Sequence, residues 1–298
     1  MPGLFHEPIG RRRFLRTTFV GAAGMVFGSC RTFSGPGGGR REFHLALLSD
    51  THIPADPENG YRGFSPRENL RRAVAEALAA EAEAMVVSGD AARTDGAIED
   101  YQELRRLLEP AAARMPIAIG LGNHDHRENL LRVFPEQPGL RPPVEHRHVL
   151  VIEHGVVRVI VLDSLLYVNQ VAGLLGQAQR DWLAGYLPTI ADRPAVLVVH
   201  HSPGNGDWEL LDADRLFQIL RPHRHVKAVF HGHTHAWGLG RRHDVDLVNL
   251  PSVGFNFRDQ DPVGWVEARF LDDGVHLVLH AIGGSRAEDG RGVELAWT

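Results

Sequence analysis

A packet of ligand-type side chains, Gly122-Asn123-His124-Asp125, follows the apolar run Met115-Pro116-Ile117-Ala118-Ile119. The run predicts a buried strand, and open α/β folds place their sites where such strands end. Asn123 offers a neutral carbonyl oxygen, His124 an imidazole that titrates near neutrality, and Gly122 lets the backbone turn sharply. A turn capped by Asn and Asp is the alternative interpretation of this tetrapeptide alone.

Four further packets of this kind recur, each directly after an apolar run. They are Asp50-Thr51-His52 after residues 43–49, Gly89-Asp90 after residues 85–88, His200-His201 after residues 195–199, and His231-Gly232-His233-Thr234-His235 after residues 226–230. Singly, a strand-end Asp is more often a helix cap, and a lone His is more often a surface or core residue. Together the five strand ends predict one site, built from Asp50, His52, Asp90, Asn123, His200, His233 and His235.

The order of the expected elements indicates an α/β fold. Three apolar runs, residues 43–49, 85–88 and 115–119, alternate with helical patterns, the first of which opens with the capping box Ser65-Pro66-Arg67-Glu68. Such alternation predicts right-handed crossovers and a largely parallel sheet. Further along, the patterns predict a hairpin over 149–162, helices over 177–187 and 210–220, and strands over 195–199, 226–230, 246–250, 263–270 and 275–280. Residues 283–292, rich in glycine and charge, are expected to form a surface segment.

The seven side chains have the chemistry of metal ligands. Oxygen and imidazole groups without thiolates suit Zn, Mn or Fe, as divalent or trivalent ions, better than a structural thiolate zinc. Seven ligands are too many for one catalytic ion that keeps an open position. They fit two ions that share one carboxylate.

The motifs Asp-x-His, Gly-Asp, Gly-Asn-His-Asp, a strand-end His and Gly-His-x-His, in this order, resemble those of the calcineurin-like metallophosphoesterase superfamily. The resemblance covers roughly residues 43–235. It implies an α/β fold of four layers, αββα, in which two mixed β-sheets are flanked by helices. Asp163-Ser164 and the following 179–183 helix look most like the class III cyclic-nucleotide phosphodiesterase branch.

The resemblance also implies a role for each candidate. Asp90 would bridge two metals, the first held also by Asp50, His52 and His235, and the second by Asn123, His200 and His233. His124 would be the general acid or a ligand of the substrate phosphate. His201 matches a pocket residue of some members, and Arg93 and His126 are further candidates for phosphate contact. Asp125 and Asp95 are the candidates for orienting His124.

The chain departs from the protein-phosphatase branch, which has Asp-Arg-Gly after the Gly-Asp packet. Here residues 91–96 read Ala-Ala-Arg-Thr-Asp-Gly, so phosphoprotein phosphatase activity is not expected. The expected reaction is hydrolysis of a phosphodiester or small phosphomonoester by a hydroxide that both metals hold, with His124 protonating the leaving group. The alternative is a non-catalytic surface lipoprotein that uses the same fold as a binding module. A decayed enzyme should have lost a ligand or His124, and none is lost.

The first forty residues read as a targeting segment. Arg11-Arg12-Arg13-Phe14-Leu15-Arg16 and the apolar residues 17–29 resemble a twin-arginine export signal, and residues 27–30, ending at Cys30, resemble a lipobox. The apolar run is shorter than the ~20 residues that span a bilayer. A plain membrane anchor or a disordered arm is the alternative. We therefore expect an export signal over 1–30, a flexible linker over 31–41, a phosphoesterase domain over 42–298, and an exported protein whose one membrane contact is a lipid on Cys30.

Composition narrows the partners. The 298 residues carry a net charge of −5, which argues against a nucleic-acid polymer as partner. The single cysteine excludes an intramolecular disulfide, and the 18 histidines favour metal binding. The expected partner is a small-molecule phosphate ester.

Overall fold

A computed structural model describes residues 41–297 of the chain as two six-stranded β-sheets with helices outside them. The first sheet has the order β12-β11-β10-β1-β2-β3, with bounds β1 Phe43–Leu48, β2 Ala84–Val87, β3 Ile117–Ile119, β10 Pro262–Leu271, β11 Gly274–Gly284 and β12 Gly292–Ala296. The second has the order β4-β5-β6-β7-β9-β8, with bounds β4 Leu150–Glu153, β5 Arg158–Leu162, β6 Ala195–Val199, β7 Val226–His231, β8 Gly238–Arg242 and β9 Val245–Asn249.

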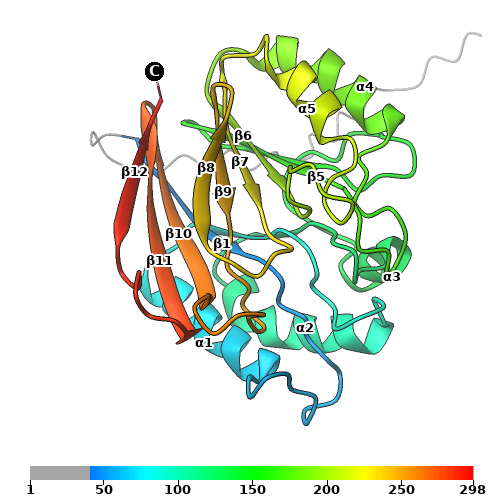
Figure 1. Ribbon diagram of the computed structural model, residues 1–298, viewed down its shortest axis with the longest axis vertical. Coiled ribbons are helices and arrows are strands. Elements are labelled where there is room, and N and C mark those ends of the chain that lie inside the picture. Colours follow the sequence, from blue (N-terminus) through cyan, green and yellow to red (C-terminus); the bar gives the residue numbers. More distant parts are fainter. Residues whose placement is uncertain (1–40, 298) are drawn as a thin grey trace, which may run out of the picture. The chain divides into compact units, whose positions relative to one another are not determined.

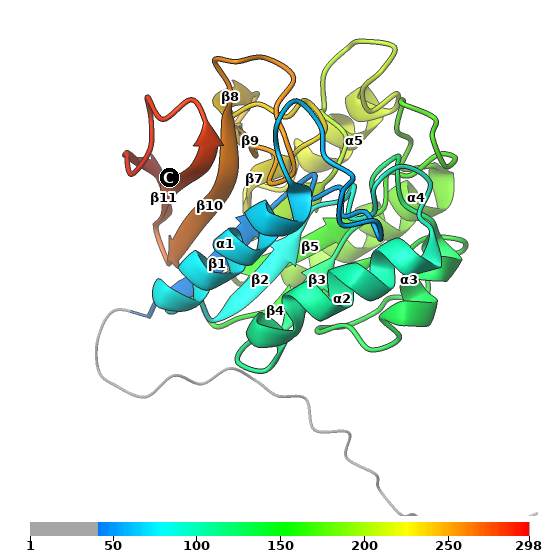
Figure 2. The ribbon, with the colours of Figure 1, turned by 90° about the horizontal axis from the view of Figure 1, so that it is seen from below.

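The helices cover the outer faces of the two sheets. Figure 2 shows α1 and α2 across the first sheet, and Figure 1 shows α4 and α5 beside the second. Their bounds are α1 Pro66–Ala79, α2 Ile98–Ala112, α3 Arg127–Val133, α4 Gln177–Tyr186, a 3₁₀ turn Leu187–Ile190, and α5 Ala213–Leu220. The four-layer αββα architecture with two mixed sheets is therefore confirmed.

The alternating side chains of β1 explain the layers. Ala46 and Leu48 belong to a core shared with α1 and α2, whereas Leu45 and Leu47 belong to a second core shared with the other sheet. Successive residues of a strand point to opposite faces, so a strand that is buried along its whole length, as β1 is, needs cover on both sides. A third core packs the outer face of the second sheet against α4 and α5.

The expected N-cap at the start of α1 is present, whereas the Glu68 carboxylate contacts Arg71. Ser65 is the N-cap, its Oγ accepts a hydrogen bond from the Glu68 amide, and Pro66 occupies the first helical turn. Pro is tolerated there because the first helical amides have no partner within the helix.

Residue patterns alone overstated the parallel content of the first sheet. β1, β2 and β3 are parallel, but β1 pairs antiparallel with β10, which continues antiparallel into β11 and β12. Four elements were not anticipated: α3, β8, β12 and the 3₁₀ turn Leu187–Ile190. The two strands are edge strands with mostly exposed or half-buried side chains, so they lack an apolar run. Part of the expected surface segment over 283–292 instead extends β11 and begins β12.

The expected export signal, and the linker up to residue 40, lie outside the described residues. Among the helices of residues 41–297, none has the length and apolar character needed to cross a bilayer.

Candidate metal centre

The seven candidate ligands lie at the carboxyl ends of strands from both sheets. Asp50 and His52 follow β1, Asp90 follows β2, and Asn123 follows β3, while the histidines follow β6 and β7. Five of the seven have left-handed backbone, with φ of 51° at Asp50, 47° at His52, 49° at Asp90, 72° at His233 and 54° at His235. Non-glycine residues rarely adopt this conformation, and such strain persists mainly where surrounding structure enforces a functional geometry.

Two motif glycines allow the strand ends to converge. A Cβ on Gly122 would lie 2.2 Å from Asp90 Oδ1 and 2.7 Å from the His200 ring. A Cβ on Gly232 would lie 2.5 Å from Asp50 Oδ2. Only glycine permits these approaches, so Gly122 and Gly232 are needed for packing as well as for turning.

The first group of ligand-type side chains consists of Asp50, His52 and His235. The Nε2 atoms of His52 and His235 are 3.1 Å apart, and His235 Nε2 is 3.3 Å from Asp50 Oδ1. The Nδ1 atoms contact backbone carbonyls, of Arg93 at 3.2 Å and Phe255 at 2.5 Å, so each Nδ1 must carry the proton. The neutral tautomer of each ring therefore has its lone pair on Nε2, and the two Nε2 atoms face each other and a carboxylate, an arrangement that a cation would stabilise.

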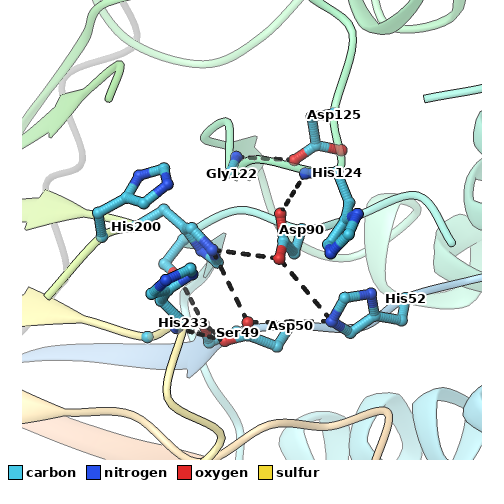
Figure 3. A network of polar contacts seen from close by, with 12 residues as sticks. Ser49, Asp50, His52, Asp90, Gly122, His124, Asp125, His200 and His233 are labelled. Carbon is cyan, nitrogen blue, oxygen red and sulfur yellow. Dashed lines mark hydrogen bonds and ion pairs between the residues drawn. The ribbon is translucent and has the colours of Figure 1, made fainter. Parts of the chain in front are cut away.

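The second group consists of Asp90, His200 and His233. His200 Nε2 lies 3.3 Å from Asp90 Oδ2 and 3.8 Å from Asp50 Oδ1. Asp90 Oδ2 is also 3.8 Å from His52 Nε2, so this carboxylate lies between the two groups, as Figure 3 shows. His233 donates from Nε2 to the Trp208 carbonyl at 2.9 Å, which leaves its Nδ1 as the free ring nitrogen.

Burial and charge act in opposite directions at the centre. Burial lowers the pKa of His52 to about 3. Burial alone would also lower the pKa of His200, but Asp90 and Asp50 outweigh it and raise the pKa to about 9. Burial would raise the pKa of Asp90, yet His200 and His52 hold it well below its usual range. The centre thus keeps its carboxylates ionised.

Two buried oxygens of the centre fit a bound cation. Within the described residues, Asp50 Oδ1 and Asn123 Oδ1 have no hydrogen-bond partner. Buried polar atoms are normally satisfied, so a group of orphaned acceptors indicates an additional positive partner. The 3.1 Å between the Nε2 atoms of His52 and His235 is near the roughly 3.3 Å expected for two imidazoles on one tetrahedral ion.

His124 lies at the edge of this centre. Its backbone amide donates to Asp90 Oδ1 at 2.7 Å, and its ring is edge-on to His52 with centroids 5.3 Å apart. Its Nδ1 is 2.7 Å from the Thr94 carbonyl and 2.9 Å from Asn169 Oδ1. The expectation that Asp125 or Asp95 orients the ring is replaced by this pair of oxygens.

Asp125 has a different structural role. It is fully buried and accepts hydrogen bonds from the amides of Ala91, Ala92 and Gly122, at 2.9 to 3.2 Å, and from the Tyr101 hydroxyl at 2.9 Å. These bonds tie the turn after β2 to the turn after β3. Asp125 therefore sets the position of Asp90 relative to Asn123.

The three residues expected to contact phosphate have different positions. His201 is buried against His200 and His233, with Nδ1 2.7 Å from Ser164 Oγ. Arg93 lies near the first group, with its guanidinium carbon 5.4 Å from the centre of the Phe255 ring. His126 instead caps α3, where its Nδ1 accepts from the Asn129 amide at 3.4 Å.

An aromatic cluster beside the first group was missing from the expectations. Phe257 stacks on His235 at 4.1 Å, Phe255 stacks on His52 at 4.8 Å, and Tyr61 packs on Phe255 at 4.7 Å. Tyr61 and Phe257 are exposed. Asn169 and Trp208 were also missed, since they lie in loops without a motif and reach the site only through tertiary contacts.

The αββα sandwich and the two adjacent ligand groups define the class of dinuclear metal-dependent phosphoesterases. The chain belongs to the calcineurin-like phosphoesterase family, whose sequence model matches residues 43–237.

Curated relatives agree with this membership, and a solved structure shares the fold. The chain is 28% identical over 247 residues to the 3′,5′-cyclic adenosine monophosphate phosphodiesterase CpdA of Pseudomonas aeruginosa, covering 77% of this chain and 86% of that protein. It is 27% identical over 219 residues to the glycerophosphodiester phosphodiesterase GpdQ of Enterobacter lignolyticus, covering 70% and 77%. Its fold matches a dimetal phosphatase from Danio rerio with a TM-score of 0.68 at 14% identity, over 86% of this chain and 99% of that one.

Proposed function

We propose that the chain is a metal-dependent phosphodiesterase that hydrolyses small phosphodiesters. The observation that supports this most strongly is the position of Asp90, between two histidine-containing groups and hydrogen-bonded to the His124 turn. Relatives named for cyclic nucleotides and for glycerophosphodiesters favour diester substrates over monoesters. The residue types favour Mn, Zn or Fe as the metal.

The proposed ligands follow the two groups. Asp50, His52 and His235 would hold one ion, Asn123, His200 and His233 the other, and Asp90 would contact both. When bound, such ions bring the pKa of a coordinated water toward neutrality and stabilise charge on the phosphoryl oxygens. The rings of His52, His235 and His233 each contact the backbone carbonyl of another residue. These contacts fix the ring tautomers and orient the free ring nitrogens toward the proposed metal positions.

His124 is the proposed general acid. With Nδ1 bonded to oxygen acceptors, its Nε2 is the nitrogen that can deliver a proton to the leaving oxygen. Arg93, near the first group, and His201, against His200 and His233, are the proposed contacts for the rest of the ester. The aromatic cluster of Tyr61, Phe255 and Phe257 would pack against an apolar or planar ester group.

The test is activity after metal removal and return. Metal-stripped protein should hydrolyse bis(p-nitrophenyl) phosphate and a glycerophosphodiester only after Mn, Zn or Fe(II) is added, with about two ions bound per chain. The control variant is Asp272→Ala, in the exposed turn between β10 and β11. It should show the same metal-dependent activity as the wild type. A chain that binds two ions and cleaves neither diesters nor monoesters would be a binding module instead.

Export is a separate proposal, supported by the sequence of residues 1–30. Replacing Arg11 and Arg12 with Lys should trap the precursor inside the cell, and Cys30→Ser should release the exported protein from membranes if that cysteine carries a lipid. Export of the double-Lys variant at the normal level would contradict the twin-arginine interpretation.

A further inference from the structure

The loop between β5 and α4 contacts the His124 turn. Asn169 in this loop donates its backbone N–H to the Asn123 carbonyl at 2.7 Å, and its side-chain Oδ1 lies 2.9 Å from His124 Nδ1. The loop belongs to the second sheet, whereas Asn123 and His124 follow a strand of the first. One residue therefore joins the two halves of the domain at the edge of the metal centre.

The hydrogen-bond chemistry fixes which atoms face each other. The Thr94 carbonyl, 2.7 Å from His124 Nδ1, can only accept, so Nδ1 must carry a proton. Asn169 must then present its oxygen, not its amide nitrogen, to the same N–H. Two oxygens accept from one N–H from two directions, which restricts rotation of the ring.

The loop is held firmly at its base. Asp163 is buried and pairs with Arg127, whose Nη2 is 2.9 Å from Asp163 Oδ1. Arg127 and Arg147 both donate to the Leu165 carbonyl. Asn169 itself has φ of 62°, a left-handed conformation that Asn tolerates better than most residues. The loop conformation thus presents the Asn169 side chain to His124.

We infer that Asn169 is a positioning residue for the reaction: it holds the His124 ring so that Nε2 faces the leaving oxygen. This inference rests on the proposed function, because it requires His124 to act as the acid. The Asn169 side chain is exposed and is not part of the hydrophobic core. Its removal should therefore alter the orientation of His124 and leave the domain folded.

Asn169→Gly isolates the side chain, because glycine accepts the left-handed backbone and keeps the N–H that bonds to the Asn123 carbonyl. Turnover of glycerophosphocholine, which has an alkoxide leaving group, should fall about 3- to 10-fold, the effect of one hydrogen bond. Turnover of bis(p-nitrophenyl) phosphate should fall less than about twofold, since nitrophenolate needs no proton. Asn169→Asp keeps an acceptor oxygen and should restore most of the glycerophosphocholine turnover.

Three comparisons separate positioning from a structural role. The metal content and the unfolding midpoint of Asn169→Gly should equal those of the wild type. The adjacent exposed control, Gln170→Ala, should leave the turnover of both substrates unchanged. In a His124→Gln background, Asn169→Gly should cause no further loss, because both changes remove the same proton donor. If glycine loosens the loop, Asn169→Ser, whose hydroxyl is too short to reach Nδ1, replaces it.

Equal losses on the two substrates, or losses that add in the His124→Gln background, would overturn the inference. Failure of the proposed function gives a different result: the metal-loaded wild type would cleave neither ester, or His124→Gln would leave glycerophosphocholine turnover unchanged.

Discussion

The two ligand groups lie side by side but are held in different ways. In the group of Asp50, His52 and His235, both rings donate to backbone carbonyls and pack against the aromatic cluster. In the group of Asp90, His200 and His233, the fully buried His200 ring has no hydrogen-bond partner for Nδ1 among the described residues and lies among carboxylates.

This difference predicts different behaviour without metal. The first group is preorganised by the backbone, and its His52 stays neutral because burial lowers the pKa to about 3. In the second group, the raised pKa of His200, about 9, means that a proton occupies the ring at neutral pH and pairs with Asp90. A metal entering the second group must displace this proton, so its affinity should depend more strongly on pH.

Asp90→Ala should have the largest effect on turnover and metal content, because both ligand groups share this carboxylate. It removes the carboxylate between them and the acceptor of the His124 amide. Turnover should fall about 10³-fold or more, because a metal ion contributes several kcal/mol of transition-state stabilisation. Elemental analysis should show loss of at least the second ion, and a variant that kept two ions and full turnover would contradict the shared-carboxylate scheme.

His200→Ala and His235→Ala should separate the two ions. The His200→Ala variant should bind one ion, held by the preorganised first group. The His235→Ala variant should bind its ion in the second group, with higher affinity at pH 9 than at pH 7, because the metal competes with the His200 proton. Metal titration at the two pH values measures this. Identical titrations for both variants would mean that the groups are equivalent.

In the metal-free protein, His200 and His52 should make the free energy of unfolding depend on pH with opposite signs. His200 has a raised pKa, so its contribution is present below pH 6.5 and is lost as the pH rises through about 9. His52 has a lowered pKa, so the unfolded chain gains a proton first and stability falls as the pH drops from 6.5 toward 3. His200→Gln should therefore destabilise more at pH 6 than at pH 9.5, and the cost of His52→Gln should shrink below pH 6.5. Urea unfolding across this range tests both signs.

Phe257→Ala should have the smallest effect and sharpen the role of the aromatic cluster. Loss of one stacking partner should raise KM for bis(p-nitrophenyl) phosphate about 2- to 10-fold, with little change for glycerophosphocholine. Leu239→Ala, at an exposed apolar position on the edge strand β8, is the control. A similar rise in KM for both substrates would mean that Phe257 supports the proposed metal ligand His235 and does not recognise the ester group.

The sequence by itself determined the positions of the candidate ligands and most of the elements. Apolar runs followed by Asp, Asn and His packets are local signals, so residues such as Asp50, His52 and Asp90 could be identified without coordinates. The resemblance to a family added the mixed sheets, which the alternation of strands and helices did not predict.

Tertiary structure alone decided how these residues act. The contact between His52 and His235 joins residues 183 positions apart, and Asn169 reaches His124 across 45 positions. The same holds for the protonated nitrogen of each imidazole, which depends on the carbonyl that the fold brings to it. Such choices follow from packing between distant segments, and a residue's own neighbours in the chain carry no energy term that specifies them.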